Sequence, residues 1–117
     1  MSQEDLSSLL PLGTGAFHVL LILAEGENHG YSIGKKLETA TGLFGTSRPG
    51  KLYGLLKQML ADGWITEVDG PESGDPRRRY YRLSPWGRRV AQAEAKRLEQ
   101  LVQIARTTKL LPRLASA

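Results

Sequence analysis

Apolar residues recur along the chain at spacings that predict two helices before residue 25. The first is short: Leu6, Leu9 and Leu10 form its apolar face, and Pro11 ends it. The second covers residues 16–24, where almost every position is apolar, which is typical of a helix that is buried on all sides.

Two more helices follow, and the second of them has the clearest amphipathic pattern. Asn28 is the expected N-cap of a helix that is closed by Gly42. The next helix is expected over 48–62, with Ser47 as its N-cap and Gly63 at its end. Its apolar stripe has helical spacing and consists of Leu52, Leu55, Leu56, Met59 and Leu60. The opposite side is therefore solvent-accessible and carries Lys51, Gly54, Lys57 and Gln58.

A β-hairpin is predicted after these helices. Residues 64–69 and 78–83 are rich in β-branched and aromatic side chains, and turn-forming residues fill 70–76. Because side chains alternate along a strand, Tyr81 and Leu83 are expected to face the core together.

A long final helix is predicted from Ser84, an N-cap followed by a proline, to about Leu110. Such a helix is roughly 35–40 Å long and extends beyond so small a body. It carries an apolar stripe of Ala91, Ala95, Leu98, Leu101, Val102 and Ala105. A second copy of the chain is the simplest partner that would bury this stripe.

The elements therefore predict a mainly α fold with a small β-hairpin: a winged helix-turn-helix followed by a long C-terminal dimerisation helix. We expect a DNA-binding unit over residues 1–84, a dimerisation helix over 85–113 and a disordered tail over 114–117.

Charge is distributed unevenly, which indicates a polyanionic partner. The net charge is +4, but residues 77–113 hold 11 basic and 2 acidic residues, whereas residues 1–76 hold 5 basic and 10 acidic residues. A basic segment of this kind suits nucleic acid, although solvated helix faces are an alternative explanation.

The helix at 48–62 is the predicted major-groove reader. Arg48 and Lys51 lie near its N-terminus, where they can donate to guanine or to phosphates, and the sequence leaves both options open. Gly50 and Gly54 allow close approach to DNA, and Lys57 is placed to meet the backbone.

The hairpin provides a second basic element. Arg77, Arg78 and Arg82 are expected to neutralise phosphates or to enter a minor groove. Arg79 has the inward parity, so it either contacts DNA or anchors the wing.

Four motifs in this order resemble the PadR family of bacterial transcriptional regulators, over roughly residues 15–106. They are His29-Gly30-Tyr31, Pro49-Gly50-Lys51-Leu52-Tyr53, Asp62-Gly63-Trp64-Ile65 and Arg78-Arg79-Tyr80-Tyr81-Arg82-Leu83-Ser84. The resemblance implies a dimeric winged-helix repressor whose N-terminal and last helices build the interface, which adds Leu6, Leu9 and Leu10 to the stripe. The length and the single trailing helix resemble the short subfamily.

The resemblance also implies residue roles, with two departures. Tyr31 and Tyr53 match family tyrosines near the DNA backbone. Lys51 replaces a common threonine and Gly54 a common proline, so an operator sequence cannot be transferred from relatives. The candidate DNA-binding residues are Tyr31, Ser47, Arg48, Gly50, Lys51, Tyr53, Lys57, Arg77, Arg78, Arg79 and Arg82.

Many members of this family respond to small apolar molecules bound between subunits. Trp86, at the start of the long helix, is the candidate residue for such an effector pocket, because an indole stacks well on planar ligands. The favoured alternative is that it packs against the wing or the leading helix.

Catalysis is not expected. Residues 45–51 nearly match a phosphate-binding loop, but Leu52 stands where a hydroxyl is needed for Mg²⁺. His18 and His29 have no catalytic arrangement around them, and without cysteine a zinc site is difficult to assemble. We expect no cofactor and no metal.

The chain is also expected to be cytoplasmic and not membrane-bound. It has no cysteine, its longest apolar run is far shorter than a span, and its N-terminus is acidic. Two functions remain in competition: a DNA-binding repressor, and a ligand-sensing or protein-interaction module that kept the fold without binding DNA.

Overall fold

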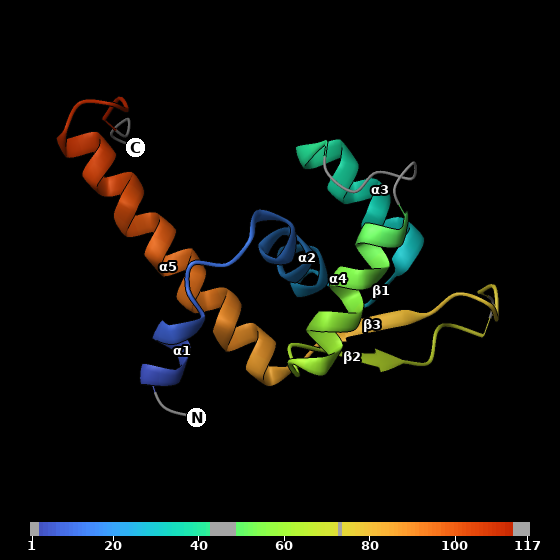
Figure 1. Cartoon of the computed structure of the whole chain (residues 1–117). Helices are drawn as coiled ribbons and strands as arrows, with labels where there is room; N and C mark the ends of the chain where they lie inside the picture. The colour runs from blue at the N-terminus through green and yellow to red at the C-terminus, as the bar shows by residue number, and fades with distance from the viewer. Residues whose placement is uncertain (1–2, 43–48, 73, 114–117) are drawn as a thin grey trace.

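The structure is a computed structural model that describes residues 3–42, 49–72 and 74–113 (Figure 1). Its elements are α1 (Gln3–Leu9), α2 (Thr14–Ala24), β1 (Asn28–His29), α3 (Gly30–Thr41), α4 (Pro49–Ala61), β2 (Ile65–Val68), β3 (Tyr80–Leu83) and α5 (Pro85–Thr107). The predicted cap Ser47, the predicted contact Arg48 and the tail 114–117 lie outside the described residues.

Helix α2 lies at the centre of the core and packs on α3, β3 and α5. Val19 and Leu20 are completely buried, but Leu21 is 43% exposed. The prediction of a helix buried on all sides is therefore wrong for one side, because the apolar pattern does not show how many neighbours surround the helix.

Helices α3 and α4 form the helix-turn-helix, and the predicted amphipathic pattern of α4 is confirmed. Leu52, Leu56 and Met59 are buried in the core that α3 shares. The approach of the two helices is close at Gly34, where a Cβ atom would lie 2.9 Å from Cδ2 of Leu52.

The N-cap of α3 differs from the prediction. His29 caps the helix by accepting the backbone N–H of Ser32 on Nδ1, 3.2 Å away. Asn28 instead belongs to β1, where it pairs with Tyr81, and His29 pairs with Tyr80. The two-residue strand was missed because so short a segment has no periodicity of its own.

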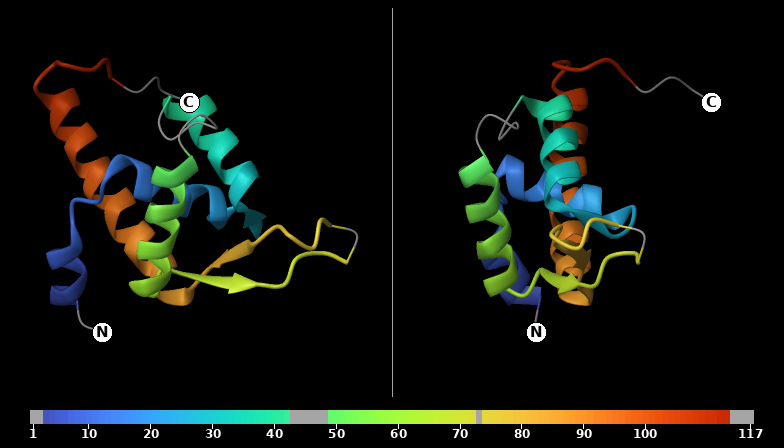
Figure 2. Two further views of the ribbon diagram at one scale, coloured as in Figure 1. Left: turned by 45° about the vertical axis from the view of Figure 1, so that its right-hand side comes forward. Right: turned by 90° about the vertical axis from the view of Figure 1, so that its right-hand side faces the viewer.

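The three strands form an antiparallel sheet in the order β1-β3-β2. Strand β2 pairs with β3 from Ile65 opposite Leu83 to Val68 opposite Tyr80. Tyr81 and Leu83 are buried, as their parity predicts. The loop of the hairpin projects beyond the helices, on the opposite side of the body from the C-terminal half of α5 (Figures 1 and 2).

Helix α5 begins as predicted and ends three residues early. The Ser84 hydroxyl accepts the N–H of Gly87 at 2.9 Å and donates to the carbonyl of Gly63 at 2.6 Å. The helix ends at Thr107 and not near Leu110. Lys109 has a left-handed φ of 65°, and the N–H groups of Leu110 and Leu111 bond the Ala105 carbonyl, which closes the helix end.

A buried carboxylate ties the N-terminal segment to α5. Glu94 is 1% exposed and accepts the backbone N–H of Leu12 at 2.6 Å, and Arg97 forms an ion pair with it from the next turn. Leu6 of α1 joins this packing and is 4% exposed. Leu6 is therefore already covered within its own chain, where α1 packs on α5, and its role at an interface with a second copy stays a prediction.

None of the helices in the described part of the chain is both long enough and apolar enough to cross a membrane.

Candidate nucleic-acid interface

The exposed side of α4 is polar and unobstructed. Lys51, Tyr53 and Lys57 are exposed while the leucines behind them are buried. At Gly50 and Gly54 a Cβ atom would meet nothing within 4 Å, so both positions face open space. This face therefore has the bare backbone and the cations that close approach to a DNA groove requires.

Tyr53 connects this face to the start of α3. A Cβ atom at Gly30 would lie 3.2 Å from Cε1 of Tyr53, so the ring lies directly over the glycine backbone. Tyr53 is 49% exposed and Tyr31 is 51% exposed. Both tyrosines that are predicted to lie near DNA are therefore at the surface. Tyr31 follows Gly30 in the sequence, and the Tyr53 ring lies against the same glycine.

Three of the four wing arginines have carboxylate partners. Arg77 binds Asp75, with Nε 3.3 Å from Oδ1, and Arg82 binds Glu27, with Nε 2.8 Å from Oε1. Hydrogen bonds from the backbone and side chain of Arg77 lower the pKa of Asp75. Part of the wing's positive charge is therefore neutralised within the protein.

Arg79 is exposed. Its side chain is 71% accessible and its Nε lies 4.0 Å from Oε1 of Glu67. The inward parity does not apply, because β3 begins only at Tyr80 and strand alternation does not extend to residue 79. The choice between a DNA contact and an anchor in the wing stays open, because the ion pair with Glu67 of β2 leaves most of the Arg79 side chain exposed.

Arg78 is the wing arginine without a carboxylate within 4.0 Å among the described residues. Its guanidinium carbon lies 5.8 Å from the centre of the Tyr31 ring, and Nζ of Lys35 lies 5.7 Å from the same ring. Two cations and a phenol thus meet where the wing joins α3. We call His29, Tyr31, Lys35, Arg78 and Tyr80 the wing-root cluster.

His29 is the centre of the wing-root cluster, and the sequence interpretation missed its role. Its Nε2 lies 3.0 Å from Nη1 of Arg78, and its ring meets Tyr80 edge-to-face with the centroids 5.2 Å apart. Burial and the neighbouring Arg78 charge lower the pKa of His29. Lys35 was also missed as a site residue, although its spacing of four residues from Tyr31 places both on one face of a helix.

The stripe on α5 becomes more exposed toward its C-terminal end. Ala91, Leu98 and Ala105 are half-buried, whereas Leu101 and Val102 are 49% and 37% exposed. Ala95 is exposed, and Leu9 and Leu10 of α1 are half-buried. Large exposed apolar side chains beyond the predicted stripe are Ile104, Leu110 and Leu111.

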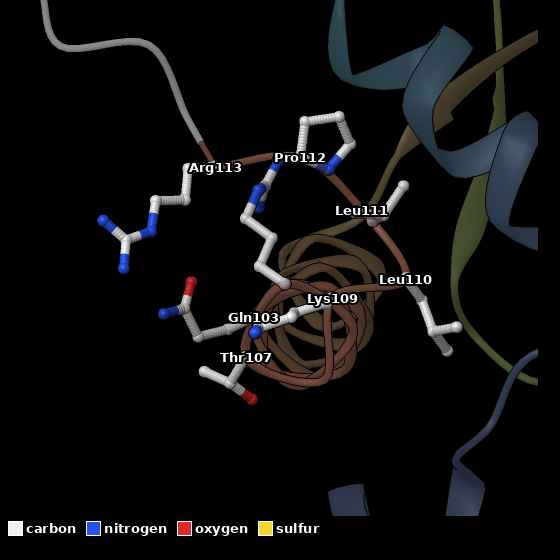
Figure 3. Close-up of a pocket in the computed structure, with 8 residues that line it drawn as sticks. Gln103, Thr107, Lys109, Leu110, Leu111, Pro112 and Arg113 are labelled. Atoms are coloured by element: carbon white, nitrogen blue, oxygen red, sulfur yellow. The ribbon is translucent and has the colours of Figure 1, made fainter.

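A cavity of about 920 Å³ lies at the C-terminal end of α5 (Figure 3). Leu110 and Leu111 lie on one side of the helix end, and Gln103 and Arg113 lie on the other. Trp86, at the opposite end of α5, packs partly buried against the core, and the guanidinium of Arg89 lies 5.5 Å from its ring. The packing explanation for Trp86 accounts for these contacts.

The fold and the basic surface define a winged-helix DNA-binding protein. The model of the transcriptional regulator PadR-like family matches residues 19–93, more than half of the chain. The protein belongs to this family, whose members regulate transcription.

Solved structures of bacterial regulators share the fold. The chain is similar to a PadR family transcription regulator of Clostridium difficile R20291, with a TM-score of 0.71 and 21% identity over 82% of this chain and 98% of the other. It is similar to a PadR-like transcriptional regulator of Bacillus cereus strain ATCC 14579, with a TM-score of 0.66 and 22% identity over 95% and 100% of the two chains. No curated protein sequence matches the chain.

Proposed function

We propose that this protein is a sequence-specific regulator of transcription that binds double-stranded DNA as a homodimer and acts as a repressor, without catalysis. The observation that best supports DNA binding is the position of Arg78. This arginine has no carboxylate partner in the described chain and lies beside the N-terminus of α3. A guanidinium in this state is available to a phosphate at little cost, because no internal ion pair has to be broken.

In this proposal residues 1–84 bind DNA and residues 85–113 join two copies. The exposed leucine, valine and isoleucine side chains on the last turns of α5 are the surface that a second copy would bury. The half-buried Leu9 and Leu10 extend this surface at α1. An apolar effector between the two copies remains part of the proposal, with Trp86 as its candidate contact.

The test is selection of bound sequences from a random duplex pool, followed by titration of the best sequence at increasing salt. We expect a palindrome with half-sites about 34–36 Å apart and a steep loss of affinity with salt. Repeating the selection with small apolar ligands tests for an effector. If the protein shows no salt-dependent duplex binding, its own promoter region included, DNA-binding repression is wrong.

The competing proposal is a ligand-sensing or protein-interaction module. It draws on the acidic balance of residues 1–76, from which Glu27, Glu67 and Asp75 neutralise wing arginines. It predicts a melting temperature that rises with a ligand or partner protein and is unchanged by any duplex.

A further inference from the structure

The two ring nitrogens of His29 each face a hydrogen-bond donor. Nδ1 lies 3.2 Å from the backbone nitrogen of Ser32, and Nε2 lies 3.0 Å from Nη1 of Arg78. A backbone N–H and a guanidinium can only donate, whereas a neutral imidazole has one accepting nitrogen and one N–H. His29 can therefore accept only one of the two contacts as a hydrogen bond.

The helix cap decides which nitrogen accepts. Ser32 is in the first turn of α3, where backbone N–H groups have no partner within the helix, and Nδ1 of His29 is the cap acceptor. The proton of the neutral ring then lies on Nε2, directed at Arg78. Nε2–H of His29 and Nη1 of Arg78 are then two donors that face each other at 3.0 Å.

The surroundings hold this donor pair in place. The edge-to-face contact with Tyr80 orients the imidazole from the sheet, and the Tyr31 ring lies beneath the Arg78 guanidinium. The ammonium of Lys35, 5.7 Å from the centre of the same ring, adds positive charge. An acceptor that is also anionic would relieve both the donor conflict and the accumulated charge.

We propose that Nε2–H of His29 and the guanidinium of Arg78 jointly bind one backbone phosphate of DNA, which makes His29 a direct DNA contact as well as a helix cap. This inference rests on the proposed DNA binding. A phosphate is favoured because the pair lies where the wing meets the helix-turn-helix: His29 directly precedes Gly30, which the Tyr53 ring of α4 contacts. A phosphate offers several acceptor oxygens to the two donors at once.

Two amide substitutions separate the cap from the contact. Asn is a strong N-cap whose Oδ1 takes the place of Nδ1, so His29→Asn keeps the cap and loses the outer donor. The longer side chain of His29→Gln carries its amide donor toward the position of Nε2 but is a poor cap. The matched control is His18→Asn, which makes the same change at the chain's other histidine, on α2.

Affinity is measured by fluorescence anisotropy on a mixed-sequence duplex at low salt, because phosphate contacts do not depend on sequence. We expect His29→Asn to weaken binding about 10-fold with an unchanged melting temperature, as for the loss of one hydrogen bond to a charged group. His29→Gln should bind within about 2-fold of wild type and melt several degrees lower. Wild-type binding by His29→Asn overturns the inference and leaves His29 as a cap alone.

Imidazole proton resonances provide a readout that does not require a DNA-binding protein. The duplex and inorganic phosphate should each shift the resonances of His29 and leave those of His18 unchanged, with sodium chloride at equal ionic strength as the reference. A response to phosphate in a protein that binds no duplex supports the anion site and overturns the DNA function. Duplex binding without a response at His29 overturns the inference and leaves the DNA function standing.

Discussion

Gly87 lies so close to Trp64 that a Cβ atom on the glycine would stand 1.9 Å from the tryptophan's carbonyl oxygen. The same carbonyl accepts the backbone N–H of Ser84 at 3.0 Å, and Oγ of Ser84 also lies 3.0 Å from it. The start of α5 is therefore held against the start of the hairpin. This junction sets the direction in which the proposed dimerisation helix leaves the winged-helix part of the chain.

We expect Gly87→Ala to lower the free energy of unfolding by about 2–3 kcal/mol, because the backbone of Trp64 has to move. Urea denaturation at neutral pH measures the change. Gly54→Ala is the control, since it adds a methyl group to open space in a helix and should stabilise the fold by up to about 1 kcal/mol. If Gly87→Ala and Gly54→Ala were equally stable, the close approach of Gly87 to the Trp64 carbonyl would be contradicted.

Glu94→Gln should lower the free energy of unfolding at pH 7 by about 1–2 kcal/mol, because it weakens the bonds to Arg97 and Leu12. The hydrogen bond from Arg97 and the one from Leu12 hold the pKa of Glu94 below its ordinary value. A carboxylate with a lowered folded-state pKa stabilises the fold above its unfolded pKa, and this stabilisation is lost as the pH falls through the folded pKa.

Wild type and Glu94→Gln should therefore converge in stability as the pH falls below about 4.5, measured by denaturation at several pH values. Glu99→Gln, at an exposed position on the same helix, is the control and should stay close to wild type throughout. A difference between wild type and Glu94→Gln that did not change with pH would show that the carboxylate charge is not responsible.

Arg78→Gln should weaken duplex binding much more than Arg82→Gln, because Arg82 already pairs with Glu27 and Arg78 has no such partner. The slope of log affinity against log salt should fall by about 0.9 for Arg78→Gln. Anisotropy titrations at several salt concentrations give both quantities. Glu27→Gln is the complementary test, since it frees Arg82 and should strengthen non-specific binding.

Leu101→Glu should convert the proposed dimer into a monomer, because it places a charge on the exposed apolar surface of α5. Light scattering at micromolar concentration measures the mass. Gln92→Glu is the control, since residue 92 lies on the opposite side of the helix from residue 101. A monomeric wild type would end the dimer proposal.

Lys51→Ala should change which sequences are selected from a random pool if Lys51 reads a base. If Lys51 contacts a phosphate, the variant should bind every duplex more weakly and keep the same preference. The comparison of selected motifs from the variant and wild type decides between these roles. Lys36→Ala, at an exposed position on α3 outside the proposed contacts, should change neither the affinity nor the selected motif.

The sequence by itself determined the order of the helices and the hairpin and the faces of most of them, but not the short strand β1. The spacing of Leu52, Leu56 and Met59 is enough to orient α4, and the pair Ser84-Pro85 is enough to start α5. These features depend on residues within one or two turns of each other, so helix periodicity, strand alternation and capping chemistry predict them.

Only the tertiary structure decided how the charged and polar groups are paired. Glu27 and Arg82 are 55 positions apart in sequence, His29 and Arg78 are 49 apart, and Leu12 and Glu94 are 82 apart. No local pattern identifies such partners, because a hydrogen bond or ion pair forms only after the elements that carry its two groups have docked. The wing arginines look alike in sequence, and packing makes Arg78 the one without a carboxylate partner in the described chain.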